Sequence, residues 1–392
     1  MIIDCDTHLM PRDAFDGVGG ELASRKPMLR FNQAGLYSAV DFPGDAPQVA
    51  GTSPLGAPGS GAMFRSLWDI EARMEDYEGR LGIDMHIILP QFSGWWSYLL
   101  EPGLATSMAR SHNESMLRIM EKFPGKILGA ALVALQDVEA SIRELDWAKK
   151  QGFKSAVLDK VFPVKEHPYG EPLGSRRELW PFFEKAQDLA MPLYLHNVQH
   201  GHRISNLLPF QRDGLYIFAP QEGQMSLVSL FSSGLLDALP KLQFVYTEAG
   251  TSFIKPLVER LNKVLEAPPV DFDDQEEPLS NGALSKIGEK LRRARAILPA
   301  SEFLEKNQKP ASHYFHNNFY FTIETEEPDL PEAIEFLGAE RFLFATDYPH
   351  DDPGGRMKFE DVRLLRDNPK ISEEHKELIR WKNAQRLFQL GV

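Results

Sequence analysis

Short apolar runs recur along the chain, and stretches with helical spacing lie between most of them. Each run is short enough to be one buried strand, and the eight runs fall within residues 1–11, 85–90, 126–135, 153–158, 191–196, 242–250, 319–324 and 341–353. Elsewhere apolar residues recur three or four positions apart, which predicts helices over residues 66–83, 103–122, 137–151, 177–190, 253–265 and 373–388. Eight strands that alternate with helices favour a parallel (β/α)₈ barrel, the TIM barrel architecture.

A doubly wound open sheet is the structural alternative to a barrel. Such a sheet usually carries a glycine-rich phosphate turn directly after its first strand. The opening residues, MIIDCDTHLMP, contain no glycine. The barrel is therefore the predicted α/β fold.

Two segments interrupt the alternation of strands and helices. Residues 12–66 have a centre rich in Gly, Pro and Ala, at 41–63, and predict a long loop after the first strand. Loops of this length are usually functional or disordered, so a lid over an active site is one interpretation. Residues 268–306 are charged and helical in character and predict an insertion between the sixth and seventh strands. We expect a single domain over residues 1–392 that contains both insertions.

Composition excludes several classes of protein. The 392 residues are 43% hydrophobic and carry a net charge of −13 without a long basic run, which argues against nucleic-acid or anionic-membrane partners. One cysteine, Cys5, excludes an internal disulfide and suits a reducing compartment. No apolar run approaches the roughly 18 residues that cross a bilayer, and no basic region precedes the first apolar residues. We expect a cytoplasmic protein.

Candidate chemistry begins in the opening strand, at Asp6 and His8. Side chains two residues apart in a strand share a face, so these two would point the same way and form half of a divalent-metal site. The alternative is that Asp6 begins a turn and His8 is hydrogen-bonded locally. Side chains at the ends of other predicted strands support the metal site, because catalytic residues of a barrel lie at the C-terminal ends of its strands.

Metal-ligating side chains follow three further strands. His196 ends the fifth strand, Glu248 ends the sixth and Asp347 ends the eighth. Each has a structural alternative: a hydrogen-bonded core histidine, an ion-paired glutamate at the barrel mouth and the N-cap of a turn. Together with Asp6 and His8 they are difficult to explain by packing, because barrel interiors consist mainly of branched apolar residues. The five side chains predict one metal site.

The chain also resembles the amidohydrolase superfamily, in the branch of metal-dependent decarboxylases that includes aminocarboxymuconate semialdehyde decarboxylase. The resemblance spans nearly the whole chain and is carried by IDCDTH with Pro11, EARMEDYEGRLGID, FPGKILGAALVALQD, the histidine after MPLYL, FVYTEAG, NNFYFTIE and FLFATDYPH. It implies that His196 is a metal ligand and that Asp347 both binds the metal and handles a proton. The family's first motif usually reads His-x-His or Glu-x-His, so Asp6 is a departure.

Glu248 is a second departure from the family pattern. The family often has a histidine there that acts on the substrate or on metal-bound water. A glutamate can serve as a general base or acid if its pKa approaches neutrality, and it can equally be a ligand or a structural anion. These roles stay open.

The expected ligand set is Asp6, His8, His196 and Asp347, with Asp347 and Glu248 as catalytic candidates. One divalent ion, zinc first and manganese second, would keep a position open for water or substrate. The main hypothesis is a non-oxidative decarboxylase of an aromatic or conjugated carboxylic acid. The alternative is a metal-dependent hydrolase of a C–C, C–N or ester bond, and a third possibility is a non-catalytic binding subunit.

Several further side chains are weaker candidates. Trp95 and Trp96 would line a pocket for a flat substrate, or else they pack against a loop or a subunit. His200 and Arg203 would contact an acidic substrate, or else they are solvated. His350 is expected to support Asp347. The resemblance implies a homodimer that acts on a small acid.

Overall fold

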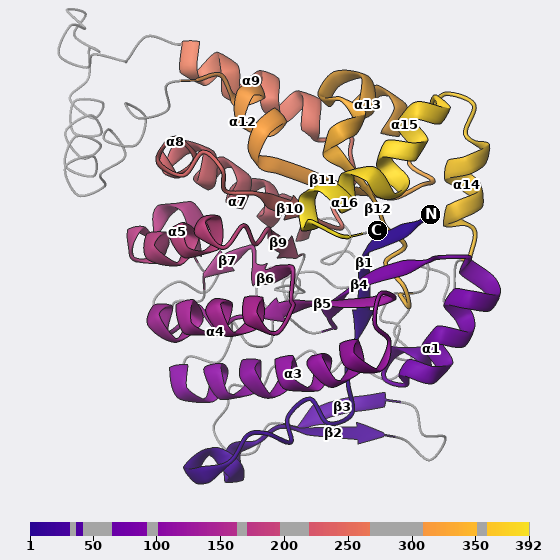
Figure 1. Cartoon of the computed structure of the whole chain (residues 1–392). Coiled ribbons are helices and arrows are strands. Elements are labelled where there is room, and N and C mark those ends of the chain that lie inside the picture. The colour runs from indigo at the N-terminus through magenta and orange to yellow at the C-terminus, as the bar shows by residue number, and fades with distance from the viewer. Residues whose placement is uncertain are drawn as a thin grey trace, which may run out of the picture.

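The strands of the main sheet are all parallel and surround one interior (Figure 1). This computed structural model describes residues 1–31, 37–41, 65–91, 101–162, 171–196, 219–266, 309–350 and 359–391. The eight strands, in their order around the sheet, are β1 (Ile3–Leu9), β4 (Met85–Pro90), β5 (Ile127–Leu132), β6 (Ser155–Asp159), β9 (Leu193–His196), β10 (Phe244–Tyr246), β11 (Phe319–Ile323) and β12 (Phe342–Phe344). Their spatial order follows the order of the chain, as in a (β/α)₈ barrel.

The ring closes between β1 and the residues that follow β12. Thr7 and Tyr348 form a parallel bridge, and the backbone N–H of His8 donates to the Tyr348 carbonyl at 2.7 Å. The N–H of Asp347 donates to the carbonyl of Asp6 at 2.9 Å. The predicted barrel is thereby confirmed, and its seam joins the first and last candidate site residues.

Helices pack around the outside of the sheet (Figure 1). They are α1 (Ile70–Asp76), α3 (Pro102–Lys122), α4 (Val138–Lys150), α5 (Trp180–Asp188), α7 (Ala219–Ser232), α8 (Leu235–Ala238), α9 (Ile254–Glu266), α12 (Ala311–Asn318), α13 (Leu330–Leu337), α14 (Asp361–Asp367), α15 (Glu373–Glu377) and α16 (Asn383–Phe388). Two π-helical segments, η3 (Tyr77–Leu81) and η10 (Leu378–Lys382), extend α1 and α15. Side-chain caps start several helices; the Asp137 carboxylate, for example, accepts the N–H of Ala140 at 2.8 Å.

The apolar core has two layers. Inside the barrel, side chains from all eight strands pack together, among them Ile3, Cys5, Val157, Tyr194, Val245 and Leu343. Residues of α16 belong to the same cluster, and Phe388 stacks on Tyr194 with ring centroids 6.0 Å apart. A second cluster lies between the strands and the outer helices. Because the interior is filled with side chains, chemistry is confined to the ends of the strands.

The structure adds elements that the hydrophobic pattern did not predict. Within the predicted loop 12–66, β2 (Met28–Phe31) and β3 (Tyr37–Asp41) form an antiparallel hairpin, which lies outside the barrel at the bottom of Figure 1. A short helical turn, η1 (Gly20–Arg25), precedes them. The prediction that this whole segment is one irregular loop was therefore wrong. β2 has only four residues, and so short a run of alternating apolar and polar positions is not enough to predict a strand.

Two regions that bear on the predictions lie outside the described residues. They are the glycine- and proline-rich stretch after Asp41 and the predicted helical insertion 268–306. Three expectations therefore stay predictions: that the glycine- and proline-rich stretch is a lid, that residues 268–306 are helical, and that the chain is a single domain containing both insertions.

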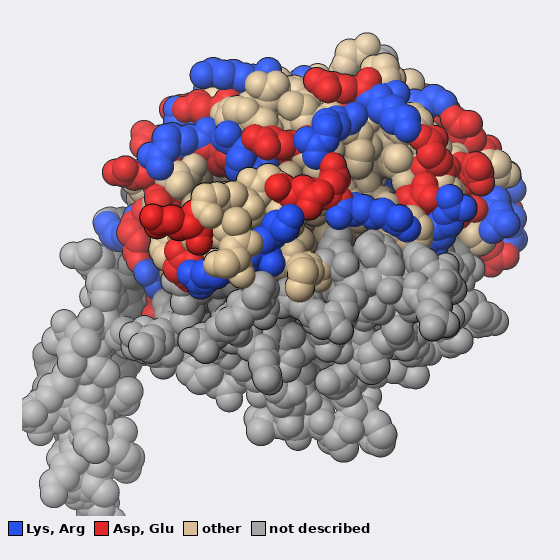
Figure 2. Space-filling model, turned by 90° about the horizontal axis from the view of Figure 1, so that it is seen from below, with Lys and Arg blue, Asp and Glu red and all other residues tan. Residues whose placement is uncertain are grey.

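Charges of both signs are interspersed on the face shown in Figure 2, and the described part of that face carries no basic stripe. Among the described helices, none has the length and apolar character needed to cross a membrane.

Candidate metal centre

A β-bulge in β1 directs the first two candidate ligands toward the barrel mouth. Asp4 pairs with His86 and Thr7 pairs with Ile88, so β1 uses three residue steps where β4 uses two. Ile3, before this irregularity, and Cys5, at its start, both belong to the apolar cluster inside the barrel. The extra residue changes the alternation, so that Asp6 and His8, rather than Thr7, face inward beyond it.

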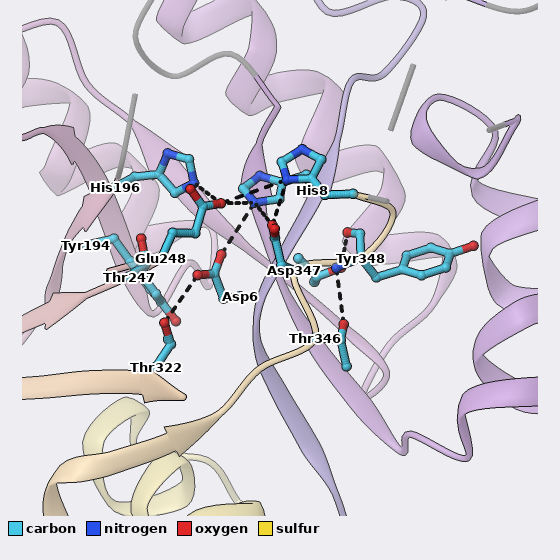
Figure 3. Close-up of polar contacts among 12 residues, drawn as sticks. Asp6, His8, Tyr194, His196, Thr247, Glu248, Thr322, Thr346, Asp347 and Tyr348 are labelled. Carbon is cyan, nitrogen blue, oxygen red and sulfur yellow. Dashed lines mark hydrogen bonds and ion pairs between the residues drawn. The ribbon is translucent and has the colours of Figure 1, made fainter. Parts of the chain in front are cut away.

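His8 is the centre of the cluster and is fully buried. Its Nε2 atom lies 3.0 Å from Asp347 Oδ1, 3.1 Å from Glu248 Oε1 and 3.5 Å from Asp6 Oδ1. Figure 3 shows these carboxylates converging on the imidazole from β1 and from the residues after β10 and β12. The prediction that Asp6 and His8 point the same way is confirmed.

His196 and Glu248 form the opposite wall of the cluster. His196 ends β9, and its Nε2 atom lies 3.1 Å from the same Glu248 oxygen that faces His8. Glu248 has a φ of 48°, in the left-handed region that residues with a Cβ rarely adopt. Asp347 has a φ of 55°. Two acidic residues with such backbone at strand ends indicate that their side chains are aimed at the site.

Asp347 belongs to a further chain of polar contacts. His350 Nδ1 lies 2.7 Å from Asp347 Oδ1, and its Nε2 atom lies 2.7 Å from the amide nitrogen of Gln91. The His350 ring stacks on that of His8 with centroids 4.3 Å apart. The Asp347 side chain is 39% exposed, whereas that of Asp6 is 1% exposed. The cluster therefore opens toward solvent on the side of Asp347.

The electrostatics of the cluster reflect an excess of carboxylates. Burial disfavours the protonated form of His8, but hydrogen bonds and charge from Asp347 and Glu248 outweigh it and raise the pKa of His8 to about 10. Burial and the nearby Glu248 raise the pKa of Asp6 well above its ordinary value. The pKa of Glu248 moves the other way: against the effect of burial, the imidazoles of His196 and His8 hold it well below its usual range. A proton on His8 thus supplies the positive charge that these carboxylates require.

The donor set fits a divalent cation. Donor atoms of Asp6, His8, His196 and Glu248 lie within 4.8 Å of one another, and so do those of an overlapping group that contains Asp347 and His350. Asp6 Oδ1 is buried and accepts no hydrogen bond within the described part of the chain. Imidazole nitrogens and carboxylate oxygens are ligands that zinc and manganese accept in proteins. A bound ion would coordinate the lone pairs of these converging atoms, which otherwise have too few hydrogen-bond donors.

Several predicted site residues lie outside the described residues, namely Trp95, Trp96, His200 and Arg203. Lys160 directly follows β6 and is 1% exposed. Its ammonium group donates to the Thr247 carbonyl at 3.2 Å and lies over the ring of Tyr246.

Sequence reasoning missed two side chains of this region. Gln91 contacts His350, and Arg73 lies fully buried beneath β1. Gln91 follows a predicted strand directly, and this position was the available signal. Arg73 carried no such signal, because it lies in an amphipathic helix where cations are usually solvated.

Eight parallel strands with a metal-ligating cluster at their C-terminal ends define a metal-dependent α/β-barrel enzyme. The profile of the amidohydrolase family matches residues 3–390, and the chain belongs to this family. Gamma-resorcylate decarboxylase of Polaromonas sp. is 27% identical over an alignment of 305 residues, and the match covers 73% of this chain and 78% of that protein. The resemblance to the decarboxylase branch of the superfamily is thereby confirmed.

Solved structures are similar in fold. The structure of 2,6-dihydroxybenzoate decarboxylase complexed with 2,6-dihydroxybenzoate matches this chain with a TM-score of 0.68 at 19% identity, and the match covers 100% of this chain and 99% of that chain. A second structure is 5-carboxyvanillate decarboxylase from Novosphingobium aromaticivorans, complexed with manganese and 4-hydroxy-3-methoxy-5-nitrobenzoic acid. Its TM-score is 0.68 at 19% identity, and the match covers 100% of this chain and 96% of that chain. At these identities the likeness concerns the fold.

Proposed function

We propose that this protein is a metal-dependent, non-oxidative decarboxylase of a hydroxylated aromatic acid. The observation that carries the proposal is the convergence of two imidazoles and three carboxylates at the barrel mouth, in a chain whose relatives are decarboxylases. No redox cofactor is required, because the reaction replaces a C–C bond with a C–H bond and releases carbon dioxide.

The proposed ligands are Asp6, His8, His196 and Asp347. Asp6 and Asp347 both approach His8 Nε2, at 3.5 and 3.0 Å, and His196 contacts the Glu248 oxygen that also faces His8. Asp347 is the more exposed of the two aspartates, so a substrate is proposed to approach from its side. When bound, the ion supplies a Lewis acid that holds substrate oxygens and stabilises developing negative charge. The carboxylate-rich donor set and the manganese in the carboxyvanillate enzyme support Mn²⁺. Zinc, which the sequence favoured, stays a prediction to be tested beside it.

Asp347 is proposed to hold the proton that the ring carbon receives. It is the most exposed of the three carboxylates, at 39%, and it lies 2.7 Å from His350, which can return a proton to it. As the bond to the carboxylate breaks, its electron pair stays on the ring carbon and takes up this proton. Glu248 is proposed to remain anionic between the two imidazoles and to fix their orientation.

The test of the proposed function is metal-dependent carbon dioxide release by the full-length protein. Metal-stripped protein is reloaded with Mn²⁺ or Zn²⁺ and assayed with 2,6-dihydroxybenzoate and 5-carboxyvanillate. We expect turnover only after reloading, and loss of both metal and turnover in His196→Ala. The matched control is His316→Ala, which removes an exposed histidine of α12.

Two outcomes would contradict the proposal. Hydrolysis of ester or amide substrates without carbon dioxide release would assign the site to the hydrolase alternative. Absence of metal binding after reloading would favour a non-catalytic subunit. A homodimer and a cytoplasmic location stay predictions, which gel filtration and fractionation of cells would test.

A further inference from the structure

A buried arginine beneath β1 contacts the backbone of the candidate metal site. Arg73 of α1 is 0% exposed, and its guanidinium donates to the carbonyl oxygen of His8 at 2.6 Å. The same guanidinium donates to the hydroxyl of Thr7 and lies 4.9 Å from the centre of the Tyr348 ring. One side chain therefore contacts two consecutive residues of β1 and the segment that follows β12.

Tyr77 and Asp4 extend these contacts. The hydroxyl of Tyr77, the first residue of η3, donates to Asp4 Oδ2 at 2.8 Å and lies 2.7 Å from Thr7 Oγ1. Asp4 also accepts the hydroxyl and the backbone N–H of Thr346, at 2.6 and 3.1 Å. Burial raises the pKa of Asp4 to about 6, although the hydrogen bonds from Thr346 and Tyr77 oppose this shift.

These contacts surround the β-bulge that turns Asp6 and His8 inward. Asp4 Oδ1 accepts the backbone N–H of Asp6 at 3.3 Å, on one side of the bulge. On the other side, the Thr7 hydroxyl donates to the carbonyl of Tyr348 at 2.7 Å. The ligand-bearing backbone of β1 and the backbone next to Asp347 are thus joined to the same few buried groups.

We propose that these groups form a positioning network that sets the spacing of the metal ligands across the seam of the barrel. The network consists of Asp4, Thr7, Arg73 and Tyr77. None of the four belongs to the two groups of residues whose donor atoms could hold an ion, so they act through β1 and the residues after β12. This inference rests on the proposed function, because it assigns the network a role in the affinity for the metal.

The geometry favours a positioning role over simple core packing. An apolar side chain at position 73 or 77 would fill the same volume without burying polar atoms, whose burial is costly unless each is hydrogen-bonded. Here the hydrogen bonds go to the backbone carbonyls of His8 and Tyr348 and to the N–H of Asp6. Groups that orient ligands in this way typically change metal affinity about 10–100-fold when altered.

The decisive experiment compares two tyrosine-to-phenylalanine variants. Tyr77→Phe removes a buried hydroxyl of the network. Tyr314→Phe is the matched control, because Tyr314 is 1% exposed and donates to Asp237 at 2.7 Å on the outside of the barrel. The affinity of the full-length protein for Mn²⁺ is measured by calorimetry, and folding by circular dichroism and thermal unfolding. We expect Tyr77→Phe to weaken Mn²⁺ binding about 10–100-fold and Tyr314→Phe to change it less than twofold.

Two results would overturn the inference without touching the proposed function. One is wild-type Mn²⁺ affinity in a folded Tyr77→Phe, and the other is an equal loss in both variants. If the wild-type protein itself binds neither Mn²⁺ nor Zn²⁺, the proposed function fails instead.

A second pair of variants covers the case in which Tyr77→Phe does not fold. Thr7→Ser keeps the hydroxyl that contacts Arg73 and Tyr348, whereas Thr7→Val replaces it with a methyl group of similar size. We expect Thr7→Ser to bind Mn²⁺ within about threefold of wild type and Thr7→Val to bind at least tenfold more weakly. Equal affinity in the two Thr7 variants would contradict the network.

Discussion

A single oxygen atom, Glu248 Oε1, lies 3.1 Å from the Nε2 atoms of both His8 and His196. The sequence left three roles open for Glu248: general acid or base, metal ligand and structural anion. The two imidazoles hold its pKa well below the usual range, which disfavours a neutral acid in the metal-free site. The Glu248 charge between the two imidazoles can serve turnover, metal binding or both.

We expect Glu248→Gln to lower kcat for decarboxylation about 100-fold or more, because an amide keeps the shape but neither moves a proton nor balances an imidazolium. Mn²⁺ content measured on the same preparation separates the roles: retained metal with lost turnover indicates a catalytic or orienting charge, and lost metal indicates a ligand. The control is Glu332→Gln on the exposed face of α13. An unchanged kcat in Glu248→Gln would show that its charge is dispensable.

Individual helices are attached to the barrel by buried polar contacts, and α14 is one example. Asp361, its first residue, is 5% exposed and accepts the hydroxyl of Thr325 at 3.0 Å. Burial raises the pKa of Asp361 to about 6, although the Thr325 hydrogen bond opposes the shift. A carboxyl whose pKa is higher in the folded than in the unfolded state stabilises the fold only while it is protonated.

The stability contributed by Asp361 is therefore expected to fall as pH rises from about 4 to about 6, since the unfolded state loses its proton first. Asp361→Asn keeps the hydrogen bond and removes the charge, so it should stabilise the protein at pH 7 by roughly 1–3 kcal/mol and raise Tm by about 2 °C or more. Scanning calorimetry at pH 4 and pH 7 tests this, with the exposed Asp329→Asn as control. An Asp361→Asn gain that is the same at both pH values would exclude the titration as its cause.

Across the whole molecule, the candidate ligands come from both ends of the chain. Asp6 and His8 lie in β1, whereas Asp347 follows β12, and the two segments meet at the seam of the barrel. A bound ion would join these strands and would also hold β9 through His196. A ligand that binds only the folded state stabilises it by mass action.

Mn²⁺ at about 100 times its Kd is accordingly expected to stabilise the protein by about 2.7 kcal/mol and to raise Tm measurably, and a chelator should reverse the shift. His196→Ala should abolish most of this gain, because it removes one candidate ligand while leaving the seam intact. Thermal unfolding with and without Mn²⁺ is the measurement. A shift of equal size in His196→Ala and wild type would place the stabilising ion elsewhere.

The sequence by itself determined the barrel and most of the candidate site. The second barrel strand was predicted over 85–90 and is β4, Met85–Pro90, because a buried parallel strand needs a continuous apolar run. His196, Glu248 and Asp347 could be grouped from their positions in the sequence, since the C-terminal ends of parallel strands meet at one mouth. Both inferences use only local pattern and one rule of topology.

The tertiary structure decided what depends on contacts between distant segments. The β-bulge that turns Asp6 and His8 inward leaves no mark in the alternation of the sequence, because Ile3 to Leu9 are all buried. Arg73 and Gln91 acquire their partners only when α1 and β4 pack against β1 and against the residues after β12. Burial and hydrogen-bond partners are properties of the assembled fold, so the spacing of one residue type along the chain does not specify them.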